Sequence, residues 1–387
     1  MIYMGITFTA NMRFGYLPSE DEIVNYGYIP LYEILAKFPQ FKANLCFSGY
    51  SELTLAKKYP KVVDMVKKGI SEGRFRISSN GFEHIPMPFV SYECTNKNIL
   101  KGIETDQKVW SIKQPDGFVP SDGSWDPTIG LLAHKAGLKW VMCHRNYVTK
   151  EKLEEYKDID PYHPVYAICP ENTRVMVPLA HNRCAVLVLR EKDMDDWFNE
   201  LKAISASRKD DVFMCATLDM EMPLAIKVQG YAENGIERFQ RFIEKWTQMQ
   251  GIEFTFIGDY LEKHPPKQEA YLKHSYWHWY GDGWCKSDGA EKLVSICSSA
   301  ERNILDCENL ISAGYNAPEV RFELEQAWEH LLFALNSEAY FTDNLSGKND
   351  GIKYPLARVN IDAYNNAIKA NELSKQIKIK LLKNTSR

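Results

Sequence analysis

Two aspartates each follow a short apolar run that is typical of a β-strand. Asp122 ends the segment Gly-Phe-Val-Pro-Ser-Asp, and Asp219 follows the run Val-Phe-Met-Cys-Ala-Thr-Leu. When parallel strands close into a barrel, carboxylates at their C-terminal ends meet at the rim where barrel enzymes keep their active sites. A facing pair of carboxylates is the minimum set for cleaving a glycosidic bond, because one protonates the leaving oxygen and the other attacks or activates water. The sequence therefore predicts a sugar-processing pair formed by Asp122 and Asp219.

The elements that must position these acids alternate along residues 1–262. Apolar runs typical of strands occur at 2–8, 43–47, 75–78, 117–119, 140–143, 175–179, 185–189, 212–217 and 254–257. Between them lie amphipathic helices such as 60–72 and 233–250, whose apolar residues recur on one face. This alternation predicts an α/β fold with βαβ units, namely a parallel and incomplete (β/α)7 barrel. An open doubly wound sheet is the alternative.

The pattern changes after residue 265. A tryptophan-rich segment is followed by three long amphipathic stretches near 289–313, 317–341 and 358–383. Residues typical of turns separate these stretches. We therefore expect a catalytic barrel domain over residues 1–265 and a C-terminal helical bundle over residues 266–387, packed on the barrel.

Composition narrows the class of protein. The chain has 387 residues, 45% hydrophobic and 25% charged, and can bury a large globular core. Its net charge of −4 and pI near 6.2 argue against a nucleic-acid partner. It has no run of about 18 apolar residues and no charged signal-peptide start, so we expect no membrane partner and a cytoplasmic location. Nine scattered cysteines without Cys-x-x-Cys spacing indicate reduced thiols, and the sequence does not indicate an oligomeric state.

Several segments, in the right order, resemble the glycoside hydrolase family 57 enzymes, which are retaining α-glycosidases and transglycosidases acting mainly on α-glucans. Residues 119–127, Val-Pro-Ser-Asp-Gly-Ser-Trp-Asp-Pro, are similar to the family's nucleophile segment Trp-Leu-x-Glu-x-x-Trp-x-Pro. Residues 218–221, Leu-Asp-Met-Glu, match the Asp-x-Glu segment that carries the general acid, and residues 79–88 are similar to a Gly-x-x-His-Pro segment that lines the glycone pocket. The resemblance covers roughly residues 1–262 and, more weakly, the bundle.

This resemblance implies a two-carboxylate retaining mechanism without a cofactor or metal, in which Asp122 is the nucleophile and Asp219 the general acid and base. The implied partner is a carbohydrate substrate. Together with positions at strand ends, the resemblance suggests these substrate-binding residues: Asn11, Arg13, Glu83, His84, Trp125, His144, His181, Glu221, Trp277 and Trp279. We expect Trp277 and Trp279 either to stack on sugar rings or to join the bundle to the barrel.

Two positions depart from the family pattern. The family usually has His-Gln-Pro after the first strand, whereas residues 9–13 here read Thr-Ala-Asn-Met-Arg, so Asn11 and Arg13 could bind a hydroxyl or an acidic group instead. Asp122 stands where the family has Glu. Retaining chemistry needs carboxylates about 5–5.5 Å apart and inverting chemistry about 6.5–9.5 Å. Either the backbone compensates for the shorter side chain, or the stereochemistry differs, or hydrolase activity is lost.

Other functions are compatible with parts of the pattern. A metal-dependent polysaccharide deacetylase-like hydrolase would also use a distorted barrel, but it needs an Asp and a His-x-x-x-His pair, and only His274 and His278 have that spacing. A catalytically degenerate barrel that binds carbohydrate is the second alternative. Among the acids, Asp126 precedes a proline at a predicted helix start, so we expect it to cap that helix.

Overall fold

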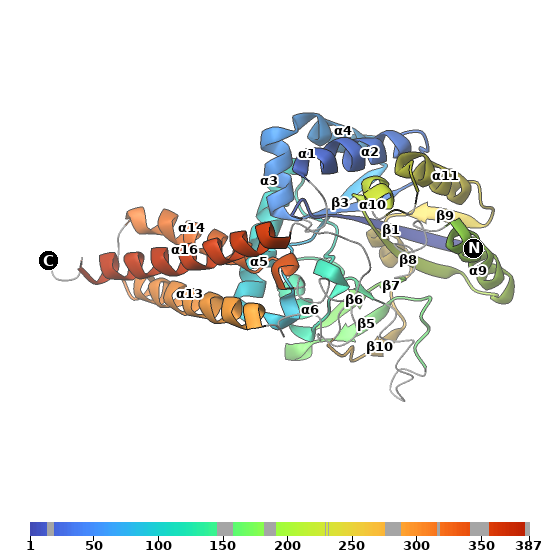
Figure 1. Cartoon of the computed structure of the whole chain (residues 1–387). Coiled ribbons are helices and arrows are strands. Elements are labelled where there is room, and N and C mark those ends of the chain that lie inside the picture. Colours follow the sequence, from blue (N-terminus) through green and yellow to red (C-terminus); the bar gives the residue numbers. More distant parts are fainter. Residues whose placement is uncertain are drawn as a thin grey trace. The chain divides into compact units, whose positions relative to one another are not determined.

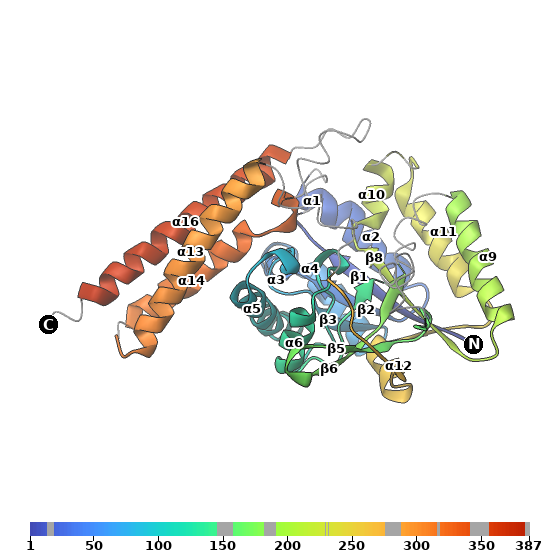
Figure 2. The same cartoon turned by 90° about the horizontal axis from the view of Figure 1, so that it is seen from below.

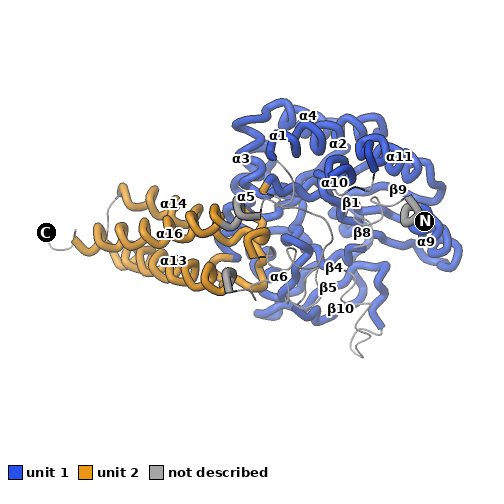
Figure 3. The backbone as a smooth tube through the Cα atoms, in the orientation of Figure 1, with its two compact units in different colours: residues 1–12, 17–82, 95–277 blue, residues 13–16, 83–94, 278–387 orange. Residues whose placement is uncertain are grey.

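The computed structural model of the chain describes residues 1–13, 19–144, 158–181, 191–228, 230, 232–274, 288–315, 318–340 and 356–383 (Figure 1). The predicted strand at 185–189 and residues Trp277, His278 and Trp279 lie outside this part of the chain. Figure 3 shows two compact units: residues 1–12, 17–82 and 95–277 form the first, and residues 13–16, 83–94 and 278–387 form the second. Short segments near residues 13 and 83 thus belong with the C-terminal helices, and residues 266–277 belong with the first unit.

Most described strands of the first unit form a closed parallel barrel. Its main strands are β1 (Ile2–Ala10), β2 (Ala43–Phe47), β3 (Phe75–Ser79), β4 (Cys143–His144), β7 (Leu179–His181) and β8 (Val212–Asp219). They pair in the order β3-β2-β1-β8-β7-β4, and Phe118 closes the ring by bridging Ser79 and Val141. With the 118 segment, seven described strand segments surround the interior, which confirms the predicted parallel (β/α)7 barrel.

The barrel is distorted beside β1. The strand β9 (Ile252–Thr255) pairs with residues Ile2 to Gly5 of β1, whereas β2 pairs with Thr7 to Ala10 on the same side. Two strands therefore share one edge of β1, one at each end.

A small separate sheet contains β5 (Val165–Ile168), β6 (Arg174–Val177) and β10 (Gln268–Ala270), with β5 and β6 antiparallel. The predicted barrel strand at 175–179 is therefore wrong in part, because most of it forms β6 of this sheet. Pro178 has no N–H to donate to a strand ladder, so the chain leaves β6 there and the barrel strand β7 begins at Leu179.

Helices follow most strands of the barrel (Figures 1 and 2). They are α1 (Glu20–Glu22), the π-helix η1 (Ile23–Tyr28), α2 (Ile29–Leu35), α3 (Gly49–Lys58), α4 (Pro60–Ser71), α5 (Tyr92–Trp110), α6 (Pro127–Lys135), α9 (Glu191–Ser207), α10 (Met222–Val228), α11 (Gly235–Thr247) and α12 (Ile257–Lys263). Short 3-10 turns occur at η2 (Met87–Phe89), η3 (Ser121–Gly123) and η5 (Pro170–Asn172). The predicted amphipathic faces are confirmed: α11, for example, buries Phe239, Phe242 and Trp246.

Contacts between side chains inside the barrel show which strand residues point inward. Met142 belongs to the interior cluster of buried residues, and the Thr217 hydroxyl donates a hydrogen bond to its sulfur at 3.1 Å. Thr7 donates to Thr217 Oγ1 at 3.1 Å, so both threonines point inward. Since side chains alternate along a strand, Asp219, two residues after Thr217, faces the same way at the C-terminal rim.

The described part of the second unit contains three long helices, α13 (Asp288–Ser312), α14 (Pro318–Ala334) and α16 (Leu356–Lys383), which lie side by side in Figures 1 and 2. The helix α16 buries Ala363, Ala367 and Ala370 at helical spacing, and such small side chains allow close helix packing. The predicted C-terminal helical region is thus confirmed. Among the described residues, no helix combines the length and apolar character needed to cross a bilayer.

Candidate active site

Asp219 ends β8 at the rim of the barrel. It lies opposite Thr9 in the register of β1 and β8, and the Thr9 hydroxyl donates a hydrogen bond to Asp219 Oδ1 at 3.1 Å. The carboxylate is half-buried. The position therefore suits a group that exchanges a proton with a ligand while a neighbouring strand holds its other oxygen.

Glu221 lies beneath the surface next to Asp219 and is only 1% exposed. Its Oε1 accepts hydrogen bonds from the Tyr28 hydroxyl at 2.6 Å and from the Asn11 N–H at 3.0 Å. Burial, followed by the negative charge of Asp219, raises the pKa of Glu221 to about 8. Glu221 was predicted to contact substrate, but the structure buries its carboxyl among protein groups.

Asp122 lies in the turn η3, just after the barrel segment that contains Phe118. Its φ of 53° and ψ of 22° are left-handed, a conformation in which Asp is enriched several-fold over most other residues with a side chain. The turn is held by Gly123 N–H donating to Pro120 O at 3.0 Å, and the carboxyl is half-buried. The left-handed backbone is a physical reason for Asp rather than Glu at this position, and such strained residues cluster at functional sites.

His144, at the C-terminal end of β4, packs directly on this turn. Gly123 also has a positive φ of 58°, and a Cβ added there would lie 1.6 Å from His144 Nε2. The imidazole thus occupies the space that a side chain at position 123 would need. The structure therefore places His144 against the turn that carries Asp122.

Two other predicted substrate-binding residues are buried against other parts of the protein. Trp125 is fully buried, and its indole N–H donates to Leu272 O at 3.0 Å. The ring of His181 lies 4.9 Å from that of Trp197, and its Nε2 is 3.4 Å from Glu200 Oε1 on α9. Since Ala180 belongs to the interior cluster of the barrel, alternation turns His181 outward to the helix. We therefore leave Trp125 and His181 out of the proposed site.

Arg13, Glu83 and His84 come together in the second unit. Glu83 is 0% exposed, and its Oε2 pairs with Arg13 Nη1 at 2.8 Å. Asn336 Nδ2 donates to Glu83 Oε1 at 2.9 Å, and His84 Nδ1 lies 2.8 Å from Ser337 Oγ. The sequence analysis missed Asn336 and Ser337, because their place beside Glu83 depends on a contact between distant parts of the chain.

Asp126 has the capping role that was expected. Its Oδ1 accepts the Thr128 N–H at 2.7 Å at the start of α6, and its Oδ2 is 3.0 Å from His274 Nδ1. Burial opposes ionisation, but the hydrogen bonds from His274 and Thr128 outweigh it and lower the pKa of Asp126. His274, the first histidine of the His-x-x-x-His spacing, is thus held by a helix-capping aspartate.

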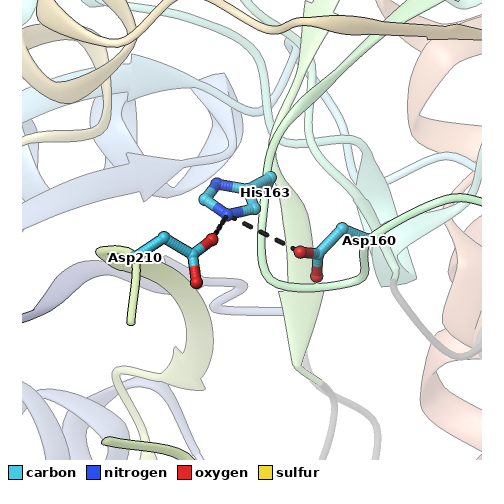
Figure 4. Close-up of side chains that lie close together, drawn as sticks. All are labelled: Asp160, His163 and Asp210. Atoms are coloured by element: carbon cyan, nitrogen blue, oxygen red, sulfur yellow. Dashed lines mark hydrogen bonds and ion pairs between the residues drawn. The ribbon is translucent and has the colours of Figure 1, made fainter. Parts of the chain in front are cut away.

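Figure 4 shows Asp160, His163 and Asp210, each of which has an atom that could bind a metal. These atoms lie within 4.8 Å of one another. His163 Nε2 is 3.0 Å from Asp210 Oδ2, but Arg208 also pairs with Asp210 at 2.9 Å and with Asp160 Oδ1 at 3.0 Å. The guanidinium already supplies the positive charge, so this cluster suits an ion-pair network rather than a metal. The cluster lies at the start of β8, whereas Asp219 lies at its end. At about 3.3 Å per residue, the length of β8 separates the two by roughly 23 Å.

Comparison of the sequence with protein families finds a match to the model of glycosyl hydrolase family 57 over residues 13–273. The chain is 22% identical over 183 residues to the 4-alpha-glucanotransferase of Thermococcus litoralis, covering 46% of this chain and 28% of that protein. It is 25% identical over 132 residues to alpha-amylase 1 of Dictyoglomus thermophilum, covering 33% of this chain and 19% of that protein. The chain thus spans less than a third of these curated relatives.

Solved structures show the same fold. A family 57 branching enzyme from Thermococcus kodakaraensis superposes with a TM-score of 0.70 at 14% identity, covering 98% of this chain and 93% of that one. The Thermococcus litoralis enzyme superposes with a TM-score of 0.69 at 18% identity, covering 95% of this chain and 59% of that one. At such identities the likeness establishes the architecture, in which both the barrel and the C-terminal helices are shared.

Proposed function

This chain belongs to glycosyl hydrolase family 57, and we propose that it cleaves or transfers an α-linked sugar with Asp122 as nucleophile and Asp219 as general acid and base. One observation carries the proposal. Both aspartates follow strands of a single closed parallel barrel on its C-terminal side, where barrel enzymes keep their chemistry. The relatives named a glucanotransferase and an amylase support a substrate of the α-glucan class.

In this mechanism, Asp219 protonates the glycosidic oxygen as Asp122 attacks the anomeric carbon, so that the leaving sugar departs and a glycosyl ester forms on Asp122. Asp219 then takes a proton from water or from a sugar hydroxyl, which attacks the anomeric carbon and releases Asp122. Water gives hydrolysis and a sugar hydroxyl gives transfer. No cofactor is required for either step.

The left-handed turn supports the alternative in which the backbone compensates for the shorter acid. A residue with positive φ projects its side chain differently from one in an extended strand, and His144 packs against the same turn. We propose that the turn sets the reach of Asp122 and that His144 limits its movement.

Substrate binding falls to the other residues at or near strand ends. We propose that Asn11 contributes to it in the first unit, as the family resemblance implies. For Arg13 and His84, which belong to the second unit, substrate binding stays a prediction of that resemblance. The Arg13 side chain is 10% exposed and His84 is 8% exposed, whereas Glu83 is fully buried. The Glu83 carboxylate pairs with Arg13 and accepts a hydrogen bond from the His84 backbone N–H.

The test is turnover of an aryl α-glucoside and of malto-oligosaccharides by the purified chain. Asp122→Ala and Asp219→Asn should each lower kcat by at least about a thousand-fold, with Asp219→Asn also removing the proton donor. Azide should partly restore the Asp122→Ala variant and give a glycosyl azide. Asp126→Asn is the matched control, because asparagine caps a helix as well as aspartate does, and it should keep wild-type activity.

Wild-type activity in Asp122→Ala would show that this acid belongs to a structural turn. Saturable binding of malto-oligosaccharides without turnover by the wild-type chain would instead support the catalytically degenerate barrel.

A further inference from the structure

A π-helical turn packs against the end of β8 that carries Asp219. The six residues of η1 (Ile23–Tyr28) form this turn. π-helices are rare in proteins, and those that occur are often found at functional sites. A Cβ added at Gly27 would lie 3.3 Å from the Cα of Glu221, so glycine allows the helix to approach this backbone closely. The next residue, Tyr28, is thereby brought to the Glu221 carboxyl.

The contacts of Glu221 indicate where its proton lies. Oε1 accepts two hydrogen bonds, from the Tyr28 hydroxyl at 2.6 Å and from the Asn11 N–H at 3.0 Å. Tyr28 and Glu221 are 0% and 1% exposed, so bulk water does not solvate the pair. Because a neutral carboxyl donates from one oxygen and Oε1 is committed to accepting, the acidic proton belongs on Oε2.

The groups that act on Glu221 come from each element packed against it. Asp219 from β8 adds a negative charge, Tyr28 from η1 and the Asn11 N–H donate hydrogen bonds, and Tyr32 from α2 lies near enough to feel the carboxylate. Burial and Asp219 favour the neutral form of Glu221, whereas the two donors favour the ionised form.

We propose that Glu221 is a positioning residue for the general acid, and that Tyr28 and Glu221 form a buried pair which keeps one proton shared with Asp219. The inference rests on the proposed function, since it assigns Asp219 the acid role. Two neighbouring carboxyls do not both ionise easily, so their protons leave in two separate steps, and the pKa of each step belongs to the pair rather than to one residue. With Glu221 present, the second proton leaves the pair only at alkaline pH, so a proton stays beside the general acid across the neutral range.

The proposal predicts shifts of opposite sign in two variants. Glu221→Gln removes the second carboxyl, so the last proton leaves at the lower pH of a single acid. Tyr28→Phe removes a donor that favours ionised Glu221, so the pair holds its last proton to higher pH. Tyr32→Phe is the matched control, because Tyr32 is 2% exposed but its hydroxyl donates to Met220 Sδ at 3.1 Å.

The experiment measures kcat/KM against pH with an aryl α-glucoside, which reports the ionisations of the free enzyme. The alkaline limb should move down by at least about one pH unit in Glu221→Gln and up by about one unit in Tyr28→Phe. The limb should stay in place in Tyr32→Phe. Thermal unfolding at pH 6 shows which variants fold. If Tyr28→Phe does not fold, the shift of the alkaline limb in Glu221→Gln decides the test.

Turnover by all variants with an unmoved alkaline limb would overturn the positioning role while leaving the proposed function intact. An absence of turnover in the wild-type chain would refute the proposed function and the positioning role together.

Discussion

A second pair of buried carboxyls makes the stability of the barrel unit depend on pH. Glu52 on α3 and Asp106 on α5 are 0% and 1% exposed and hydrogen-bond to each other. The indole of Trp110 donates to Glu52 Oε1. Burial raises the pKa of Asp106 to about 7, although hydrogen bonds from Glu52 and Ser79 oppose the rise. The pKa of Glu52 is raised as well, by burial first and then by Asp106.

The size of the effect follows from proton linkage. Between the unfolded pKa of Asp, about 3.9, and the folded value of about 7, the folded chain binds a proton that the unfolded chain has released. The stabilisation is fully present below pH 4 and is lost as pH rises through 7. The slope is about 1.4 kcal/mol per pH unit while only the folded chain holds the proton, so Asp106 alone removes about 3 kcal/mol between pH 5 and pH 8.

The assay is urea unfolding of the wild type and Asp106→Asn at pH 5, 6, 7 and 8. The loss of unfolding free energy from pH 5 to pH 8 should be about 3 kcal/mol smaller in the variant, because asparagine does not titrate. Asp64→Asn, at an exposed position on α4, should follow the wild type. If Asp106→Asn and the wild type lose stability in parallel, then Asp106 is ionised in the folded chain and the reasoning is refuted.

Two further substitutions test the rim and the second unit. Gly123→Ala should lower kcat at least about ten-fold, because the new Cβ needs the space of the His144 ring. Gly137→Ala is the control, because it also replaces a glycine of positive φ but its Cβ meets nothing closer than 3.8 Å. This variant should lose stability and keep its kcat. Equal kcat in both variants would contradict the packing of His144 on the turn. Arg13→Gln should lower the free energy of unfolding by about 3–5 kcal/mol in urea, because it leaves the buried Glu83 without its cation. A loss below about 1 kcal/mol would contradict the stabilising role of the Arg13–Glu83 ion pair.

Local patterns predicted much of the barrel. The strand at 43–47 and the helices near 60–72 and 233–250 were recognised because apolar residues recur at the spacing of a strand or of one helix face. The strand at 175–179 was misplaced because β6 and β7 are both apolar and only Pro178 between them marks the change of sheet. Periodicity shows that a segment is a strand but not which neighbour it pairs with.

By itself, the sequence determined the alternation of strands and helices, the two aspartates that follow strands, and the family to which the chain belongs. Tertiary structure alone decided that His181 faces a helix, that Asp122 is left-handed, and that Glu221 is buried against Tyr28. Tyr28 and Glu221 are 193 positions apart, and no local pattern encodes that contact. The physical reason is that the burial and charge state of a side chain depend on which distant elements pack around it, and these become neighbours only when the barrel closes.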